Sequence, residues 1–165
     1  MSIMTSEERK IYALADFLSK KYYGVGFRGN NVLLCDEKDR FVVAITGEDL
    51  TDTAAMFVPL NDENGKAVIL VNKTSFWTNF DEIEKNSDYK FWEIAMQVSM
   101  IFHEVTHYAL WRKGLQYDDG EVDFENAARE FGFKTNVSES FDSKKMYHIY
   151  EEFDRTYFDT YKFTF

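Results

Sequence analysis

The feature that most constrains the fold is a long run of apolar residues at helical spacing between Asp88 and Lys113. These residues recur at steps of three and four positions until Gly114 ends the run. They are Phe91, Ile94, Val98, Ile101, Val105 and Tyr108. A helix with such a stripe buries one side in the core and can turn another side towards a cleft. The pattern therefore predicts a helix over residues 88–113.

The segment His103-Glu104-Val105-Thr106-His107 lies within this predicted helix and has the HExxH spacing of a hydrolytic zinc site. Residues i and i+4 share one face of a helix, so both imidazoles can reach a single metal ion. Glu104 is displaced by about 100° towards the water that completes the coordination. The spacing predicts a Zn²⁺ site on His103 and His107, with Glu104 as the general base.

A catalytic zinc ion takes three protein ligands, so a further donor is required. The sequence offers His148 and, on the element after the motif helix, Glu121, Glu125 and Glu130. We predict Glu125, because it flanks the apolar face of its helix. If Phe124 faces the core, Glu125 projects about 100° away and Glu121 about 60° on the same side, whereas Glu130 lies about 120° away on the opposite flank. Glu121 follows Gly120 directly, at the start of the helix, where its direction is poorly fixed.

The remaining periodicities predict an α+β fold. Thr5 and Glu8 have capping-box spacing before a helix over residues 6–23 that Gly24 closes. Strand-like segments follow, and two shorter helices come after the motif helix, the first over residues 121–130. The strand-like segments are 32–35 and 41–46 around a polar turn, then 56–60 and 67–72 around a loop ending in Asn64-Gly65. Two hairpins predict a small antiparallel sheet of about four strands.

The last predicted helix runs through Met146, Tyr150 and Phe153 and precedes an alternating aromatic tail, Tyr161, Phe163 and Phe165. No repeat, low-complexity linker or internal boundary interrupts the chain. Residues 1–165 are therefore predicted to form one domain.

Three segments together resemble a small gluzincin metallopeptidase: His103–His107, the turn through Gly114 and Gly120, and Phe124-Glu125-Asn126-Ala127-Ala128. The chain is most similar to compact, often phage- or stress-associated peptidases of the ImmA/IrrE type, and less so to SprT-like zinc proteins. The resemblance implies a minimal zincin-like fold, zinc as cofactor and a protein or peptide as substrate. The family's third ligand opens a Glu-Ala-Asn segment, where this chain reads Glu125-Asn126-Ala127.

Further roles at the site are predicted from position in the chain. His148, Tyr147 or Tyr150 could stabilise the oxyanion if the last helix closes the cleft. The segment 67–72 is predicted as the edge strand that pairs with an extended substrate. Asp118, Asp119 and Asp123 could orient a ligand histidine, but a solvated acidic loop is the favoured interpretation.

Composition excludes several function classes. The formal charge is -10 and the pI near 4.8, which disfavours nucleic acid as a partner. No leader or apolar segment long enough to span a membrane is recognised, so we expect a cytoplasmic protein with no membrane partner. Cys35 is predicted to be a small buried hydrophobe.

The sequence leaves one alternative to the peptidase open, a zinc-binding interaction module without catalytic activity. A di-iron bundle is disfavoured, because it needs two Glu-x-x-His pairs and only Glu104 with His107 fits.

Overall fold

The computed structural model describes residues 5–51, 53–61, 65–73, 80–86, 88–135 and 140–160. Within these ranges it shows an α+β fold of six helices and a three-stranded mixed sheet. The helices are α1 (Ser6–Tyr23), α2 (Arg40–Thr46), α3 (Phe80–Asn86), α4 (Lys90–Arg112), α5 (Val122–Phe131) and α6 (Ser143–Thr160). The strands are β1 (Asn31–Cys35), β2 (Ala55–Asn61) and β3 (Lys66–Asn72).

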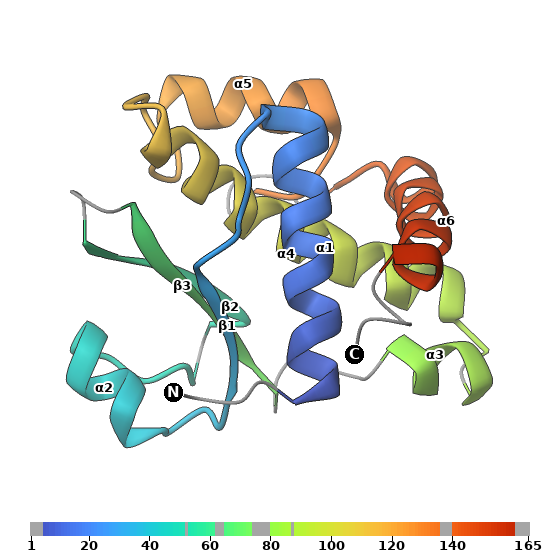
Figure 1. Ribbon diagram of the computed structural model, residues 1–165, viewed down its shortest axis with the longest axis horizontal. Helices are drawn as coiled ribbons and strands as arrows, with labels where there is room; N and C mark the ends of the chain where they lie inside the picture. The colour runs from blue at the N-terminus through green and yellow to red at the C-terminus, as the bar shows by residue number, and fades with distance from the viewer. Residues whose placement is uncertain are drawn as a thin grey trace.

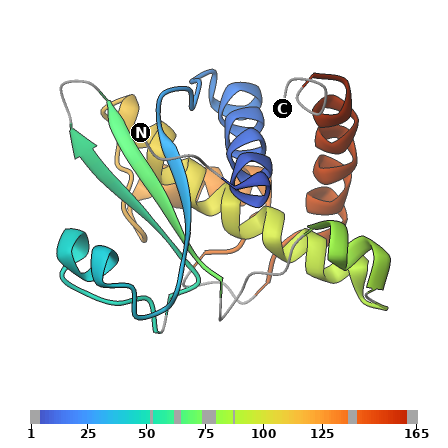
Figure 2. The ribbon, with the colours of Figure 1, turned by 60° about the horizontal axis from the view of Figure 1, so that its bottom comes forward.

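The long helix α4 is the element around which the others are arranged (Figure 1). It contacts α1, α3, α5, α6 and β2. In both views α1 lies between the sheet and α6, and α4 passes across all three (Figure 2). The C-terminal half of α4, which carries His103–His107, lies at the sheet, while its N-terminal end lies at α3. The motif histidines are therefore brought next to the sheet.

The first helix follows the local signals in its sequence. The Thr5 side chain accepts a hydrogen bond from the Glu8 backbone, and the Glu8 carboxylate accepts one from the Thr5 backbone at 2.8 Å. Gly24 caps the C-terminal end. The predicted bounds, 6–23, are confirmed, because capping and apolar spacing are both local properties of the chain.

The predicted four-stranded antiparallel sheet is wrong in its number of strands and in part of its pairing. The strand order is β1-β3-β2, in which β2 is antiparallel to β3 but β1 is parallel to it. Strand β3 thus has a neighbour on each side, and residues 67–72 are not an edge. Within the described residues, the edge strand on the α4 side is β2.

The segment 41–46, predicted as a strand, forms helix α2. Its β-branched residues favour a strand, but local capping favours a helix. The Asp39 carboxylate accepts a hydrogen bond from the Phe41 backbone at 2.8 Å, and Gly47 ends the helix. Val42 alone is fully buried in this helix, whereas Phe41 and Val43 remain exposed.

The core lies on both faces of the sheet. A large cluster joins buried residues of α1, α3, α4, α5 and α6 to one face, and a small cluster under α2 covers the other. Cys35 belongs to the small cluster and is buried, as predicted. Asn64 and the aromatic tail with Tyr161, Phe163 and Phe165 lie outside the described residues. No helix in the described part of the chain is long and apolar enough to cross a membrane.

Candidate metal centre

A cleft of about 890 Å³ opens between the sheet edge and the C-terminal half of α4. Its walls come from four parts of the chain: β2 with the residues before it, one face of α4, the loop after α4, and the segment after α5. The lining residues are Thr53, Ala54, Ala55, Met56, Phe57, Met96, Met100, His103, Glu104, His107, Asp118, Asp119, Lys134 and Thr135. All three functional residues of the HExxH segment face this cleft.

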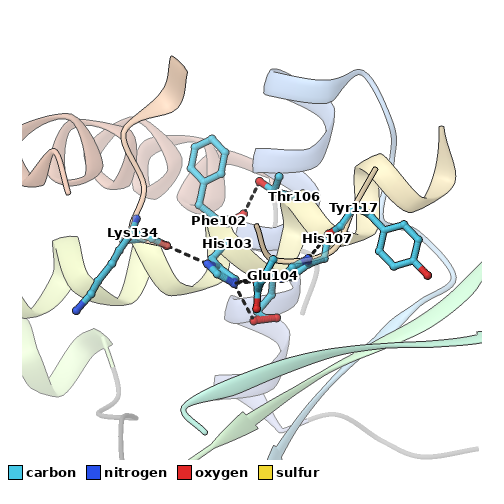
Figure 3. Close-up of polar contacts among 9 residues, drawn as sticks. Phe102, His103, Glu104, Thr106, His107, Tyr117 and Lys134 are labelled. Atoms are coloured by element: carbon cyan, nitrogen blue, oxygen red, sulfur yellow. Dashed lines mark hydrogen bonds and ion pairs between the residues drawn. The ribbon is translucent and has the colours of Figure 1, made fainter. Parts of the chain in front are cut away.

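The two histidines are held by main-chain carbonyl groups through their Nδ1 atoms (Figure 3). The Nδ1 atom of His103 lies 2.9 Å from the carbonyl oxygen of Lys134. The Nδ1 atom of His107 makes a short hydrogen bond to the carbonyl oxygen of Tyr117. A carbonyl oxygen can only accept, so both Nδ1 atoms carry the proton. In the neutral rings, both Nε2 atoms are therefore unprotonated.

These Nε2 atoms meet at the base of the cleft. They lie 3.1 Å apart, and His103 and His107 are 5% and 9% exposed. Two nitrogen lone pairs at this distance, with no proton between them, repel each other unless a cation lies beside both. A metal-binding histidine is commonly held in this way, with its second nitrogen donating to a carbonyl.

Asp119 is the third group at this point. Its Oδ1 atom lies 3.1 Å from Nε2 of His103 and 3.1 Å from Nε2 of His107. Its side chain is 42% exposed and is presented by the loop between α4 and α5. In the metal-free protein these contacts need a proton on at least one imidazole.

The electrostatics of the metal-free protein follow from these contacts. Burial disfavours protonation of His103, but the Asp119 and Glu104 carboxylates and the Lys134 carbonyl outweigh it and raise the pKa of this imidazole. The hydrogen bonds from His103 and His107 hold the pKa of Asp119 well below its usual range. The carboxylates of Asp119 and Glu104 create a negative potential around the two imidazoles, and this potential attracts a cation.

Glu104 lies beside the two imidazoles (Figure 3). Its side chain is 4% exposed, and its Oε1 atom is 3.9 Å from Nε2 of His103. Its Oε2 atom is fully buried and has no hydrogen-bond partner among the described residues. Burial raises the pKa of Glu104, against the opposing charges of the two histidines. A buried carboxylate oxygen without a partner is costly, which indicates that a group absent from the polypeptide completes its hydrogen bonding. His103, Glu104 and His107 together form a group able to hold a metal ion.

Aromatic side chains cover the imidazoles on the side of α5 and of the sheet. The Phe124 ring is stacked on His107, with centroids 4.4 Å apart, and meets His103 edge-on at 4.9 Å. Phe57 of β2 is also nearly parallel to His107, at 6.2 Å. These contacts fix both rings and exclude water from their faces.

The structure does not bring Glu125 to the two histidines. Because Phe124 faces the imidazoles, Glu125 projects into a separate hollow of about 260 Å³ that it shares with Phe133 and Asp142. Glu121 is used inside the loop, where its Oε1 atom accepts from the Asp118 backbone at 2.9 Å. Glu130 is exposed near the end of α5.

The predicted oxyanion donors do not line the cleft either. His148 is exposed on α6. It lies about 200° around that helix from the buried Met146, so it faces away from the core. Tyr150 is buried, and Tyr147 packs against Phe91 at 4.8 Å between ring centroids. Helix α6 therefore packs on the N-terminal half of α4 instead of closing the cleft.

From the sequence, we predict no more than an orienting role for Asp119 and favour a solvated acidic loop. No local signal separates Asp119 from Asp118 or Asp123, since all three stand in one acidic loop. The backbone path between α4 and α5 determines which of the three side chains reaches the histidines, and this path depends on tertiary contacts. Comparisons of the chain with protein-family models, with curated proteins and with solved structures give no match.

Proposed function

We propose that this protein is a zinc-dependent peptidase in which His103 and His107 bind the metal and Glu104 is the general base. The single observation that carries the proposal is the convergence of the two Nε2 atoms, 3.1 Å apart, in a cleft. The earlier resemblance to ImmA/IrrE-type peptidases stands as part of this proposal, supported by the same HExxH residues.

The donor atoms fit a zinc ion. Imidazole nitrogen is a common zinc ligand, with bonds of about 2.0–2.1 Å. Two such ligands on a tetrahedral ion lie about 3.3 Å apart, close to the 3.1 Å between the two Nε2 atoms. The chemistry that zinc supplies in such a site is Lewis-acid polarisation of a carbonyl group and a lowered pKa for a bound water.

The carboxylate of Glu104 is suited to moving the proton. It takes a proton from the attacking water on Oε2 and delivers it to the nitrogen of the leaving amine. The Oε2 atom has no hydrogen-bond partner among the described residues, so it can accept a hydrogen bond from the water.

The shape of the cleft favours an extended peptide as substrate. Strand β2 pairs with β3 on one side, and residues 53–57 of β2 and its approach line the cleft. A strand with an unpaired edge can bind an extended chain through main-chain hydrogen bonds. A peptide bound along this edge would present a peptide bond to Glu104 and the two imidazoles, which line the same cleft.

The test combines metal analysis with a change at Glu104. The purified protein should contain zinc, lose it to a chelator, and hydrolyse an unstructured protein labelled with a fluorophore. Glu104→Gln should retain zinc but lose activity by about 100-fold or more, because the general base is removed. Glu93→Gln, the same change in the first turn of α4 and away from the cleft, is the matched control.

Three results would count against the proposal. A wild-type protein without affinity for zinc would remove it entirely. Equal activity of wild type and Glu104→Gln would remove Glu104 as the base. Zinc binding by wild type without hydrolysis of any peptide would instead favour a zinc-dependent interaction module.

A further inference from the structure

We propose that Asp119, in the loop between α4 and α5, is the third ligand of the metal. This inference rests on the proposed function for the identity of the metal and assigns the residue that completes its coordination. Zinc in a catalytic site takes three protein ligands and keeps one position for water, so two imidazoles alone do not suffice.

The three atoms form an almost equilateral triangle. The distances are 3.1 Å between the two Nε2 atoms, 3.1 Å from Oδ1 of Asp119 to His103, and 3.1 Å from the same oxygen to His107. One face of a coordination tetrahedron has this shape. An ion about 2 Å from each atom would lie about 1 Å out of the plane, with its fourth position free.

The chemistry of the three atoms agrees with this geometry. Both Nδ1 protons are engaged by carbonyl groups, so the two Nε2 atoms offer lone pairs, and the carboxylate oxygen is an acceptor too. Three acceptors directed at one another repel unless a proton or a metal ion lies between them, and a metal ion can bind all three at once. A carboxylate with two neutral imidazoles is a common catalytic donor set for zinc.

The loop is constructed so that it presents Asp119 at this position. The carbonyl group of Tyr117 binds His107 two residues before Asp119. Glu121 then closes the turn, because its backbone N–H donates to the Asp118 carbonyl at 3.1 Å while its carboxylate accepts from the Asp118 backbone. Gly114 and Gly120 bound the loop with φ of 71° and 81°, a conformation that favours glycine. The same loop therefore fixes the His107 tautomer and supplies the carboxylate.

Two other carboxylates that the sequence offered as ligands, those of Glu125 and Glu121, lie at other places in the structure. Phe124 stacks on His107, and the neighbouring Glu125 lines the second hollow, where its Oε1 atom is buried without a hydrogen-bond partner among the described residues. The Glu121 carboxylate holds the loop itself. Asp119 is the acidic side chain after the motif whose oxygen the structure places within 3.1 Å of both imidazoles.

The test measures zinc affinity in three single variants by competition with a chromophoric chelator. Asp119→Ala should weaken zinc binding by more than about 100-fold, since loss of groups outside the coordination shell already costs about 10- to 100-fold. Asp118→Ala removes the same charge from the same loop, and Glu125→Ala removes the carboxylate of the following helix. Both should bind zinc nearly as tightly as wild type.

Substitution of zinc by Co²⁺ distinguishes a ligand from a residue that only supports the fold, because loss of a merely structural side chain would not change the spectrum of the bound ion. The visible spectrum of bound Co²⁺ reports its ligands, so Asp119→Asn, which keeps the size of the side chain, should alter it. Asp118→Asn should leave it unchanged. Asp119→Asn also serves as the affinity variant if Asp119→Ala does not fold.

The outcomes separate this inference from the proposed function. Zinc binding by wild type together with unchanged affinity and cobalt spectrum in the Asp119 variants would overturn the ligand assignment and leave the zinc proposal intact. A large loss of zinc affinity in Glu125→Ala, with none in Asp119→Ala, would show that the third ligand is Glu125 of α5. A wild-type protein that binds neither zinc nor cobalt would overturn both proposals.

Discussion

Main-chain carbonyl groups, not side chains, fix the Nδ1 protons of His103 and His107. The acceptors belong to Lys134 and Tyr117, so the tautomers do not depend on which side chains these positions carry. The roles proposed for Glu104 and Asp119 depend instead on their own carboxylates. Substitutions at Lys134 and Tyr117 should therefore have much smaller effects on metal binding than substitutions of the proposed ligands.

Cys35 shows how burial controls a single side chain far from the cleft. Burial, with the charges of Asp39, Glu8 and Asp36, raises the pKa of its thiol from 9.0 to about 11. The thiolate is the reactive form, so at pH 8 the folded protein holds about 100-fold less of it. We predict that iodoacetamide modifies Cys35 about 100-fold more slowly in the folded protein than in guanidinium chloride. Mass spectrometry at successive times measures the rate of modification in each condition. Similar rates in the two conditions would show that the thiol is accessible in the folded protein.

Helix α4 presents a continuous stripe of functional side chains to the cleft. Met96, Met100, His103 and His107 are spaced by four, three and four residues, and all four line the cleft. Two thioether side chains thus lie next to the imidazoles and provide an apolar surface beside the proposed reaction centre. Methionine adapts its shape to different apolar groups, so this part of the cleft suits a large apolar side chain of the substrate.

We predict that Met100→Glu lowers kcat/KM about tenfold or more for peptides with a large apolar residue beside the cleaved bond. The reason is that a charged side chain replaces the apolar contact without touching a metal-binding atom. Met100→Leu, which nearly conserves the volume, should retain activity. Kinetics on peptides with apolar and polar residues at that position check the effect. An equal loss on both peptides, or a loss of zinc, would contradict this role for Met100.

Elements defined by local signals could be predicted from the sequence, and elements defined by distant contacts could not. The capping box at Thr5 and the spacing of α1 lie within a few residues of one another, as do His103 and His107. The parallel pairing of β1 with β3 joins residues 37 positions apart, such as Asn31 and Val68. No local pattern encodes that choice. Strand propensity over 41–46 was likewise outweighed by the Asp39 cap.

The same distinction holds for the candidate centre. Helical periodicity places two imidazoles and Glu104 on one side of α4, and this follows from the sequence alone. The helical-wheel argument placed Phe124 correctly in the core but did not show that this core face meets the imidazoles. Once Phe124 occupies that position, Glu125 points elsewhere. Asp119 reaches the centre through a loop that is held on α4 by the contact of the Tyr117 carbonyl group with His107, in addition to hydrogen bonds among its own residues.

On the scale of the whole molecule, the candidate centre joins several parts of the chain. The imidazoles belong to α4, Asp119 to the following loop, and the carbonyl group that holds His103 to the segment after α5. Phe57 brings the sheet edge to the same point. A cation bound here would connect the α4 helix to the loop and, through His103, to residue 134. Metal binding should therefore stabilise the folded chain as a whole.

We predict that removing the metal lowers the melting temperature. A ligand present at 100 times its Kd that binds the folded state alone stabilises it by about 2.7 kcal/mol. At about 2–4 °C per kcal/mol for a chain of this size, this corresponds to roughly 5–10 °C. Calorimetry with and without a chelator measures the shift. Glu104→Gln should keep it, because the metal-binding atoms remain, whereas His103→Ala and Asp119→Ala should lose most of it. A chelator that removes zinc without changing the melting temperature would show that the ion does not connect these segments.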